Sequence, residues 1–202
     1  MLISIIRLRH MRVPNELIEA LMKGGIRYVE VTVPTPGALE SIAAWSANPD
    51  VVMGAGTVRH AADARAAADA GAKFFVTPTV DADVLDIAHE AGVDVYCGAM
   101  TPTEIETAYR HPAVAGVKIF PVGPLGGPSY VKAIMDPIAD IPLYPTGGVD
   151  ETNIAAYRAL GCAGAGIGGA IVAESLIADG DWTEISRRAR AIVNAWEGQV
   201  HS

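Results

Sequence analysis

The sequence predicts a closed (β/α)8 barrel, because a short apolar run followed by a helical stretch recurs eight times along its 202 residues. Several predicted helices also end in glycine just before the next apolar run, as in MKGGI, DAGAKF, EAGVDV and ALGCAG. Glycine suits the left-handed cap of a helix because it has no Cβ. The alternative is an open doubly wound sheet, but no G-x-G-x-x-G follows the first strand to support it. We therefore expect residues 1–202 to form one barrel domain, slightly shorter than the usual ~250 residues.

The expected strands are short apolar runs between glycine-rich or polar stretches. In chain order they are Leu2–Arg7, Arg27–Val33, Val51–Met53, Lys73–Thr77, Val93–Cys97, Gly116–Phe120, Pro142–Pro145 and Cys162–Ile167. The opening MLISIIRLRH runs into charged residues and has no small-residue cleavage site. We interpret it as a first strand and not as a signal peptide.

Helices are expected between these strands. They include Pro14–Lys23, Ala61–Ala70, Ala82–Ala91, Pro102–Arg110, Glu151–Leu160 and a last helix over roughly Trp182–Trp196. No linker, low-complexity segment or second domain is evident between them.

Composition narrows the classes of partner. Half of the residues are hydrophobic, the mean hydropathy is +0.28 and the formal charge is −8. No apolar stretch approaches the ~20 residues of a membrane-spanning helix. The acidic charge and the lack of a basic run argue against nucleic acid and membrane as partners. Cys97 and Cys162 form neither a disulfide framework nor a metal pattern, which favours a cytoplasmic protein.

An acid and a base are predicted inside the barrel. In YVEVTV the β-branched set Val29, Val31 and Val33 suits the helix-facing side of the strand. Side chains alternate along a strand, so Glu30 points inward. The same alternation in GVKIF turns Lys118 inward.

Other polar residues fall late in their strands, at Arg7, Thr57, Thr77 and Thr146. The carboxyl ends of barrel strands form the active face, so these side chains and the inward acid and base predict a site there. Each has an ordinary alternative: a strand lysine can reach solvent, and a strand-end threonine can cap the next helix. Their coincidence on one face favours the site.

The predicted chemistry follows from burial of the lysine. Burial disfavours the ammonium form, so the pKa of Lys118 falls. The neutral amine can then attack a carbonyl and form a Schiff base, which lets a neighbouring C–C bond break or form without a metal. Glu30 could move the protons that these steps require. The five histidines show no ligand spacing, so we expect no metal and no cofactor.

Two glycine pairs predict an anion site. PTGGV contains Gly147 and Gly148 at the end of the seventh strand, and GIGGA contains Gly168 and Gly169 at the end of the eighth. We expect each pair to open a helix, so that backbone N–H groups and the helix dipole favour a phosphate. Barrels often bind phosphate after these two strands, although tight turns alone would also require glycine.

The motifs VEVTVPT, GAGTV, FFVTPTVDADVL, VKIFPVGPLGGPSYVKAI and PTGGV…N…GCAGAGIGGAIV carry a resemblance over nearly the whole chain. The chain resembles the class I 2-keto-3-deoxy-6-phosphogluconate (KDPG) aldolase family, including its 6-phosphogalactonate and 4-hydroxy-2-oxoglutarate aldolase members. This resemblance implies a (β/α)8 barrel, usually a homotrimer. It also implies reversible cleavage of a 2-keto-3-deoxy sugar acid phosphate to pyruvate and glyceraldehyde 3-phosphate.

The resemblance also implies roles for single residues. Lys118 matches the Schiff-base lysine, Glu30 the general acid/base, and Arg7 the early arginine that binds the pyruvate carboxylate. Other matches line the substrate site at Thr57, Pro78 and Thr146, and bind phosphate through the backbone of Gly147, Gly148, Gly168 and Gly169. Two positions depart from the family pattern: Pro34 stands where gluconate-type members carry an arginine, and Ala170 where a serine is common. Both departures bear on the phosphosugar specificity and neither touches Lys118 or Glu30.

Three alternatives remain open. The substrate could be 4-hydroxy-2-oxoglutarate or another 2-keto-4-hydroxy acid. A phosphosugar isomerase or epimerase would use the same barrel, but it would need a metal or paired carboxylates. A non-catalytic sugar-phosphate binding barrel would not need a buried amine, whose burial is costly.

Overall fold

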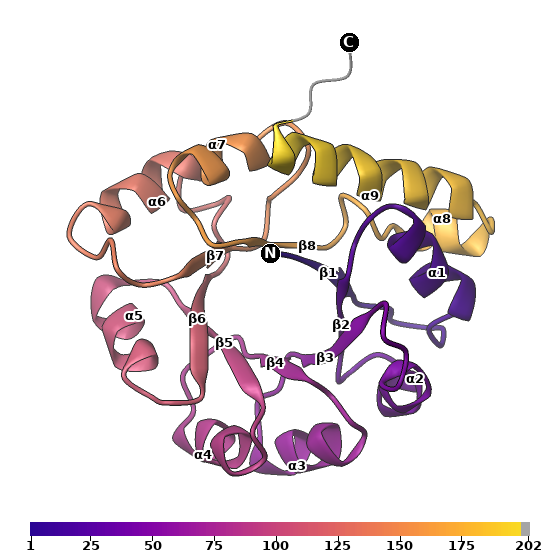
Figure 1. The fold of residues 1–202 in the computed structure, drawn as a ribbon, viewed down its shortest axis with the longest axis horizontal. Coiled ribbons are helices and arrows are strands. Elements are labelled where there is room, and N and C mark those ends of the chain that lie inside the picture. The colour runs from indigo at the N-terminus through magenta and orange to yellow at the C-terminus, as the bar shows by residue number, and fades with distance from the viewer. Residues whose placement is uncertain (199–202) are drawn as a thin grey trace.

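The structure is a computed structural model that describes residues 1–198. Strands and helices alternate from the first strand to the last, and Figure 1 shows the strands as an inner ring surrounded by the helices. The strands are β1 (Leu2–Ile6), β2 (Tyr28–Thr32), β3 (Val52–Gly56), β4 (Phe74–Val76), β5 (Asp94–Ala99), β6 (Val114–Ile119), β7 (Leu143–Pro145) and β8 (Ala165–Ile167). The helices are α1 (Asn15–Lys23), α2 (Ala38–Trp45), α3 (Ala61–Asp69), α4 (Ala82–Glu90), α5 (Pro102–Tyr109), α6 (Pro128–Met135), α7 (Ile154–Ala159), α8 (Glu174–Ala178) and α9 (Trp182–Glu197).

The strands form one parallel sheet that closes on itself. Its order is β7-β6-β5-β4-β3-β2-β1-β8, and β1 pairs with both β2 and β8. A parallel bridge between Thr146 and Gly166 joins the two ends of this order. The predicted (β/α)8 barrel is therefore confirmed, and the open doubly wound alternative is excluded.

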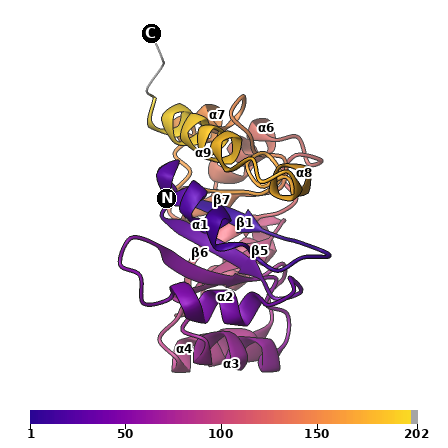
Figure 2. The ribbon, with the colours of Figure 1, turned by 90° about the vertical axis from the view of Figure 1, so that its right-hand side faces the viewer.

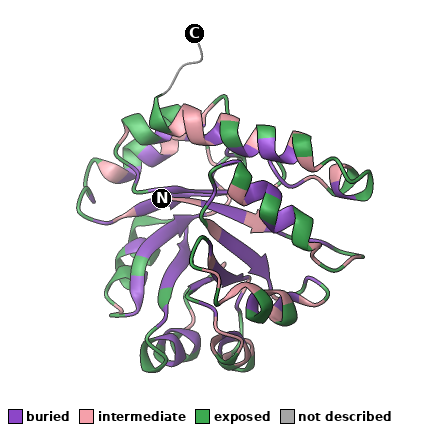
Figure 3. Cartoon of the chain, turned by 45° about the vertical axis from the view of Figure 1, so that its right-hand side comes forward, coloured by how far each residue is buried: buried purple, intermediate pink, exposed green. Residues whose placement is uncertain are grey.

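Alternation along β2 separates the two faces of the barrel wall. Val29 and Val31 are fully buried and belong to the main core, which lies between the strands and the helices. Tyr28, by contrast, packs inside the ring, in contact with a separate cluster that includes Phe74 and Tyr144. Figure 3 shows the buried strands in purple inside helices whose outer faces are green.

Aromatic side chains fill the amino-terminal end of the barrel. The ring centroids of Tyr96 and Tyr144 lie 4.8 Å apart, and those of Phe74 and Tyr96 lie 5.8 Å apart. Gly116 makes room for this packing, since a Cβ there would lie 2.5 Å from the Tyr144 ring. The aromatic layer occupies this end, so the polar side chains gather toward the carboxyl ends of the strands.

Helix α9 is the longest helix of the described chain, and it brings the C-terminal region back against the start of the barrel. Ile185, Ala189 and Ile192 are buried on one face at spacings of four and three residues. Figure 1 shows α9 lying across α1, α7 and α8, and Figure 2 shows it on the opposite side of the barrel from α3 and α4. No helix among residues 1–198 is long and apolar enough to cross a membrane.

Candidate active site

Lys118 lies on β6 inside the barrel, with only 4% of its surface exposed. Its neighbours in strand register are Gly98 on β5 and Tyr144 on β7. Its Nζ lies 4.6 Å from the centroid of the Phe120 ring. Burial lowers the pKa of this amine, and the negative charge of Glu30 opposes the change only in part. The side chain is thus biased toward the neutral, nucleophilic form.

Glu30 lies on β2 and is 1% exposed. Burial raises the pKa of its carboxyl from 4.5 to about 6, against the opposing positive charges of Lys118 and Arg7. Among residues 1–198, no donor satisfies either oxygen of this carboxylate. An unsatisfied buried carboxylate is costly, so its retention here suits a group that exchanges protons with a ligand.

The neighbouring strand provides the space that Glu30 occupies. Glu30 is in register with Gly54 on β3, and Gly56 follows two residues later on the same face of that strand. A Cβ at Gly56 would lie 1.7 Å from Oε1 of Glu30. Only glycine at this position leaves the carboxylate in its place.

Lys118 and Glu30 approach the interior from strands that lie four positions apart in the sheet. The described residues contain no ion pair between them, yet the charge of each shifts the pKa of the other. The acid and the base therefore share one interior, as the strand alternation predicted.

Arg7 follows β1 and Thr57 follows β3, and their side chains meet across the carboxyl end of β2, which lies between those strands. The Nη2 of Arg7 donates to Oγ1 of Thr57 over 3.3 Å. Thr57 has a φ of 57°, in the left-handed region that residues other than glycine seldom adopt. The positive charge of the same guanidinium lowers the pKa of Glu30 and so opposes part of the rise that burial causes.

The remaining predicted threonines and Pro78 have structural partners. Thr77 donates to the carbonyl of Thr79 at 2.8 Å and accepts from the Gly98 amide at 3.2 Å. Pro78 is half-buried beside Gly98. A Cβ added to Gly98 would lie only 2.4 Å from the backbone of Pro78, so glycine allows this close approach. Thr146 is buried and donates to the carbonyl of Tyr144 at 3.2 Å.

A cavity of about 870 Å³ opens beside β1, β7 and β8. Its lining includes several of the predicted residues, namely Arg7, Thr146, Gly147, Gly148, Gly168 and Gly169. Lys118, Glu30, Thr57 and Pro78 are not on this lining. Phe120 links the two regions, because its ring borders the cavity and also faces the Lys118 amine. Phe120 is thus a neighbour both of the Lys118 amine and of the cavity that the glycine loops line.

The glycine loops correct one expectation, that each glycine pair opens directly into a helix. α7 begins only at Ile154, and α8 begins only at Glu174. After Gly148, Asp150 accepts from the amide and the hydroxyl of Thr152, at 2.9 and 2.6 Å. Such side-chain contacts stabilise a turn in competition with the helix. Backbone conformation, not a helix dipole, is thus what the loops offer to an anion.

Three arginines of the cavity were not predicted as site residues. Arg9 follows β1, whereas Arg187 and Arg188 extend from α9. The RRAR run was a visible signal in the expected last helix. Helical periodicity predicts which residues of α9 are buried. It does not predict that Arg187 and Arg188, beside those buried residues, line a cavity together with loops from other parts of the chain.

The described residues contain no group of three or more His, Cys, Asp or Glu side chains arranged to hold a metal ion. Cys97 is buried, and burial raises the pKa of its thiol despite a contact of 3.5 Å from the Thr77 hydroxyl. The groups that the geometry offers for chemistry are therefore an amine and a carboxylate.

Comparison with known proteins shows similarity to one family of aldolases. A family model described as KDPG and KHG aldolase matches residues 1–188. A 2-dehydro-3-deoxy-phosphogluconate aldolase of Pseudoalteromonas atlantica is 36% identical over 185 residues, which cover 88% of this chain and 82% of that protein.

Solved structures agree with this result. The structure of native KDPGal is 31% identical with a TM-score of 0.86, and the match covers 98% of this chain and 95% of that one. A KDPG aldolase from Legionella pneumophila, with pyruvate captured as a covalent carbinolamine intermediate, is 27% identical with a TM-score of 0.82. That match covers 95% of this chain and 93% of the other.

Proposed function

The chain belongs to the KDPG and KHG aldolase family, and from this premise we propose how it works. It is a class I aldolase that cleaves a 2-keto-3-deoxy sugar acid phosphate reversibly to pyruvate and an aldehyde such as glyceraldehyde 3-phosphate. The observation that carries this proposal is the pair of buried groups inside the barrel. Lys118 has a lowered pKa, and Glu30 has a raised one.

The neutral amine of Lys118 attacks the C2 carbonyl carbon of the keto acid and forms a carbinolamine. A proton reaches the carbinolamine oxygen, water leaves, and a protonated imine remains. The imine withdraws electrons from C3, which prepares the C3–C4 bond for cleavage. A pKa near the working pH allows Glu30 to serve first as a base and then as an acid.

In the cleavage step, the Glu30 carboxylate removes the proton from the C4 hydroxyl. The C3–C4 bond breaks, its electron pair moves into an enamine, and the aldehyde leaves. Glu30 then returns the proton to C3, and water hydrolyses the resulting imine to release pyruvate and the free amine. Arg7, which Thr57 holds from one side, is our candidate for binding the carboxylate of the keto acid.

Other parts of the proposal concern the whole protein. We propose that residues 1–202 act as one barrel domain, that the protein works in the cytoplasm and that it assembles as a homotrimer. Small keto acid and aldehyde molecules are its substrates. Thr146, Pro78 and the glycine pairs remain candidates for contact with the substrate.

The main alternative within the family is 4-hydroxy-2-oxoglutarate, whose distal group is a carboxylate. The observation that favours it is Ala170, which lines the cavity and offers no hydroxyl to a phosphate. An isomerase or a non-catalytic binding protein would gain nothing from the buried amine of Lys118.

Borohydride trapping with pyruvate tests the Schiff base directly. The expected result is a reduced adduct on the peptide that carries Lys118, found by mass spectrometry, and its absence in Lys118→Met. Lys73→Met is the matched control, because Lys73 is exposed outside the site and its loss leaves the adduct in place. The proposal fails if pyruvate binds, as calorimetry would show, but no adduct forms on Lys118.

A further inference from the structure

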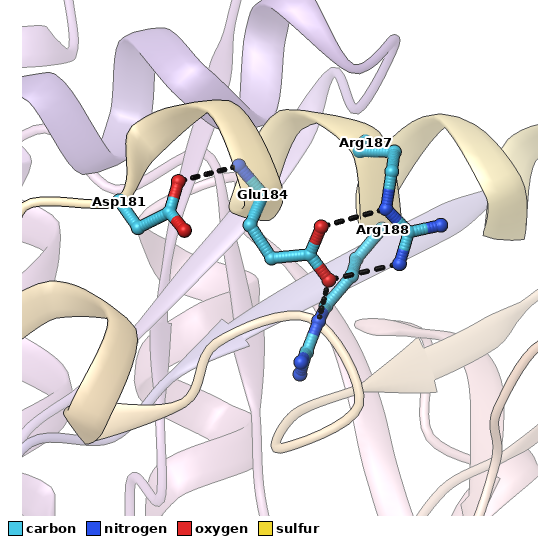
Figure 4. A network of polar contacts seen from close by, with 4 residues as sticks. All are labelled: Asp181, Glu184, Arg187 and Arg188. Carbon is cyan, nitrogen blue, oxygen red and sulfur yellow. Dashed lines mark hydrogen bonds and ion pairs between the residues drawn. The ribbon is translucent and has the colours of Figure 1, made fainter.

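Arg7 is held differently from the two arginines of α9. Arg187 and Arg188 form ion pairs with Glu184 of their own helix, as Figure 4 shows. In the described part of the chain no carboxylate pairs with Arg7, and its Nη2 donates to the Thr57 hydroxyl at 3.3 Å. Arg7 therefore keeps its charge for a ligand. One contact does not fix a long side chain, so its placement depends on the backbone that carries it.

The charge of Arg7 reaches the interior of the barrel, because it affects the pKa of both Glu30 and Lys118. In a 2-keto acid the carboxylate is bonded to the ketone carbon that the Lys118 amine attacks. The group that binds the carboxylate therefore decides how firmly the keto acid is held beside the amine.

The backbone of Arg7 lies just beyond the sheet, since the pairing of β1 with β2 ends at Ile6. The next amide along the chain belongs to Leu8, and it donates to Oγ1 of Thr35 at 3.2 Å. Thr35 lies in the loop between β2 and α2. A side chain from a neighbouring loop thus holds the main chain directly after Arg7.

Thr35 is itself fixed in a tight turn. Its amide donates to the Thr32 carbonyl at 2.8 Å, and its carbonyl accepts from the Ala38 amide at 3.0 Å. The hydroxyl oxygens of Thr35 and Thr32 lie 3.0 Å apart and share a hydrogen bond. The hydroxyl that meets the Leu8 amide therefore has a defined position.

This contact is also protected from water. Thr35 and Leu8 are both 2% exposed, and Thr32 is fully buried. A buried amide that loses its partner is costly, because no solvent can replace the hydroxyl. The following amide, of Arg9, donates to Glu174 at 3.0 Å, but Glu174 is exposed and water can take its place. The buried hydroxyl pair is the firmer anchor of the two.

We propose that Thr35 is a positioning residue for the keto acid: through the Leu8 amide it fixes the backbone from which Arg7 reaches the substrate carboxylate. This inference rests on the proposed aldolase function and adds to it a residue that touches neither the substrate nor the reacting atoms. Thr57 holds the guanidinium of Arg7, and Thr35 holds the main chain that follows it.

Thr35→Val tests the contact, because it removes the hydroxyl and keeps the branched shape. We expect Kd for pyruvate, measured by calorimetry, to rise about tenfold, as one lost buried hydrogen bond allows. KM for the aldol substrate should rise with it while kcat stays close to wild type, because the covalent bond to Lys118 holds the substrate once it has formed. A merely structural role would lower the melting temperature and leave Kd for pyruvate unchanged, which would overturn the proposal.

Two further variants frame this result. Thr35→Ser restores the hydroxyl and should return Kd for pyruvate to within about twofold of wild type. Thr107→Val is the matched control, because the Thr107 hydroxyl donates to the Thr103 carbonyl on the exposed side of α5. Weakened pyruvate binding in Thr107→Val, or no recovery in Thr35→Ser, would overturn the assignment to the Thr35 hydroxyl.

A double-variant cycle shows whether Thr35 acts through Arg7. Arg7→Gln alone should weaken pyruvate binding at least about tenfold, because it removes a charged hydrogen-bonding group. Adding Thr35→Val to Arg7→Gln should then change Kd by less than about twofold. A full effect of Thr35→Val in the absence of Arg7 would overturn the proposal.

Thr32→Val keeps the proposal testable if Thr35→Val does not fold. It leaves the bond between Thr35 and the Leu8 amide but removes the hydroxyl partner of Thr35. We expect a smaller rise in Kd for pyruvate, about two- to threefold, that again disappears in Arg7→Gln. An unchanged Kd, or a rise that persists in Arg7→Gln, would overturn the proposal.

Borohydride trapping separates this inference from the aldolase mechanism. With saturating pyruvate, the adduct on Lys118 is expected in the wild type and in Thr35→Val. Pyruvate binding that depends on Thr35, without an adduct in the wild type, would overturn the Schiff-base mechanism alone. An adduct in the wild type, with pyruvate binding that is independent of Thr35, would overturn the positioning role alone.

Discussion

At the scale of single residues, the interior holds two groups whose burial works against their charged forms. Lys118 and Glu30 are 4% and 1% exposed, and desolvation is the largest cause of the pKa change of each. A protein that folded only for stability would replace such groups with apolar ones. Their environment instead favours a neutral amine and a protonated carboxyl more than solvent would, as a nucleophile and a proton carrier require.

The raised pKa of Glu30 predicts a pH-dependent stability difference. Its value of about 6 in the folded chain exceeds 4.5, so the folded state binds more protons than the unfolded state between these values. Stability from this group is present below the lower value and is lost as pH rises through the higher one. Glu30→Gln, which mimics the neutral carboxyl, should gain about 2 kcal/mol over wild type between about pH 4 and about pH 8. Denaturant unfolding across this range measures the difference.

A matched control for this experiment is Glu19→Gln, since Glu19 is exposed on α1. Its stability should follow the wild type across the same range. If the free energies of unfolding of wild type and Glu30→Gln changed with pH in parallel, the raised pKa of Glu30 would be contradicted.

At the scale of elements, β3 shapes the site because Gly56 has no side chain and leaves space for the Glu30 carboxylate. Gly56→Ala would bring a Cβ to 1.7 Å from Oε1 of Glu30, so the carboxylate must move. We expect a loss of about 1–3 kcal/mol in the free energy of unfolding from this overpacking. We also expect at least about a 100-fold loss of kcat, because a displacement near 1 Å is enough for that.

A double variant separates the two effects. Adding Glu30→Ala to Gly56→Ala removes the clash, so stability should recover while activity should not. Normal turnover in Gly56→Ala would show that the carboxylate position is unimportant.

The helices differ from one another in how their first turns are capped. α4 and α5 begin with side-chain caps, from Asp81 and from the reciprocal pair Thr101 and Glu104. Those caps stabilise the first turns of two helices of the outer ring. α9 differs, because its cap at Asp181 fixes the first turn, in which Glu184 pairs with Arg187 and Arg188 of the cavity lining.

At the scale of the whole molecule, closure of the sheet brings the first and last strands together. β1 pairs with β8, so Arg7 and Arg9 from one end of the chain border the same cavity as Gly168 and Arg188 from the other. The proposed homotrimer is tested at this scale by sedimentation velocity. The expected species has three times the mass of one chain at all working concentrations, and a persistent monomer would contradict the trimer.

The barrel and its two central groups could be predicted from local patterns. Period-two alternation turned Glu30 and Lys118 to the interior side of their strands. The predicted helix starts after the glycine pairs were wrong, because Asp150 and Asn153 form side-chain turns that delay α7. A glycine pattern alone does not distinguish a turn from a helix start.

The sequence by itself thus determined the fold class and the shared interior of the acid and the base, since both follow from repeats a few residues long. Only the tertiary structure decided that Arg187 and Arg188 line the same cavity as the glycine loops, that Phe120 neighbours both this cavity and the Lys118 amine, and that Gly56 makes room for Glu30. These features depend on how α9 docks and how neighbouring strands register. Both are set by packing between segments that are distant in the chain, and no local period records them.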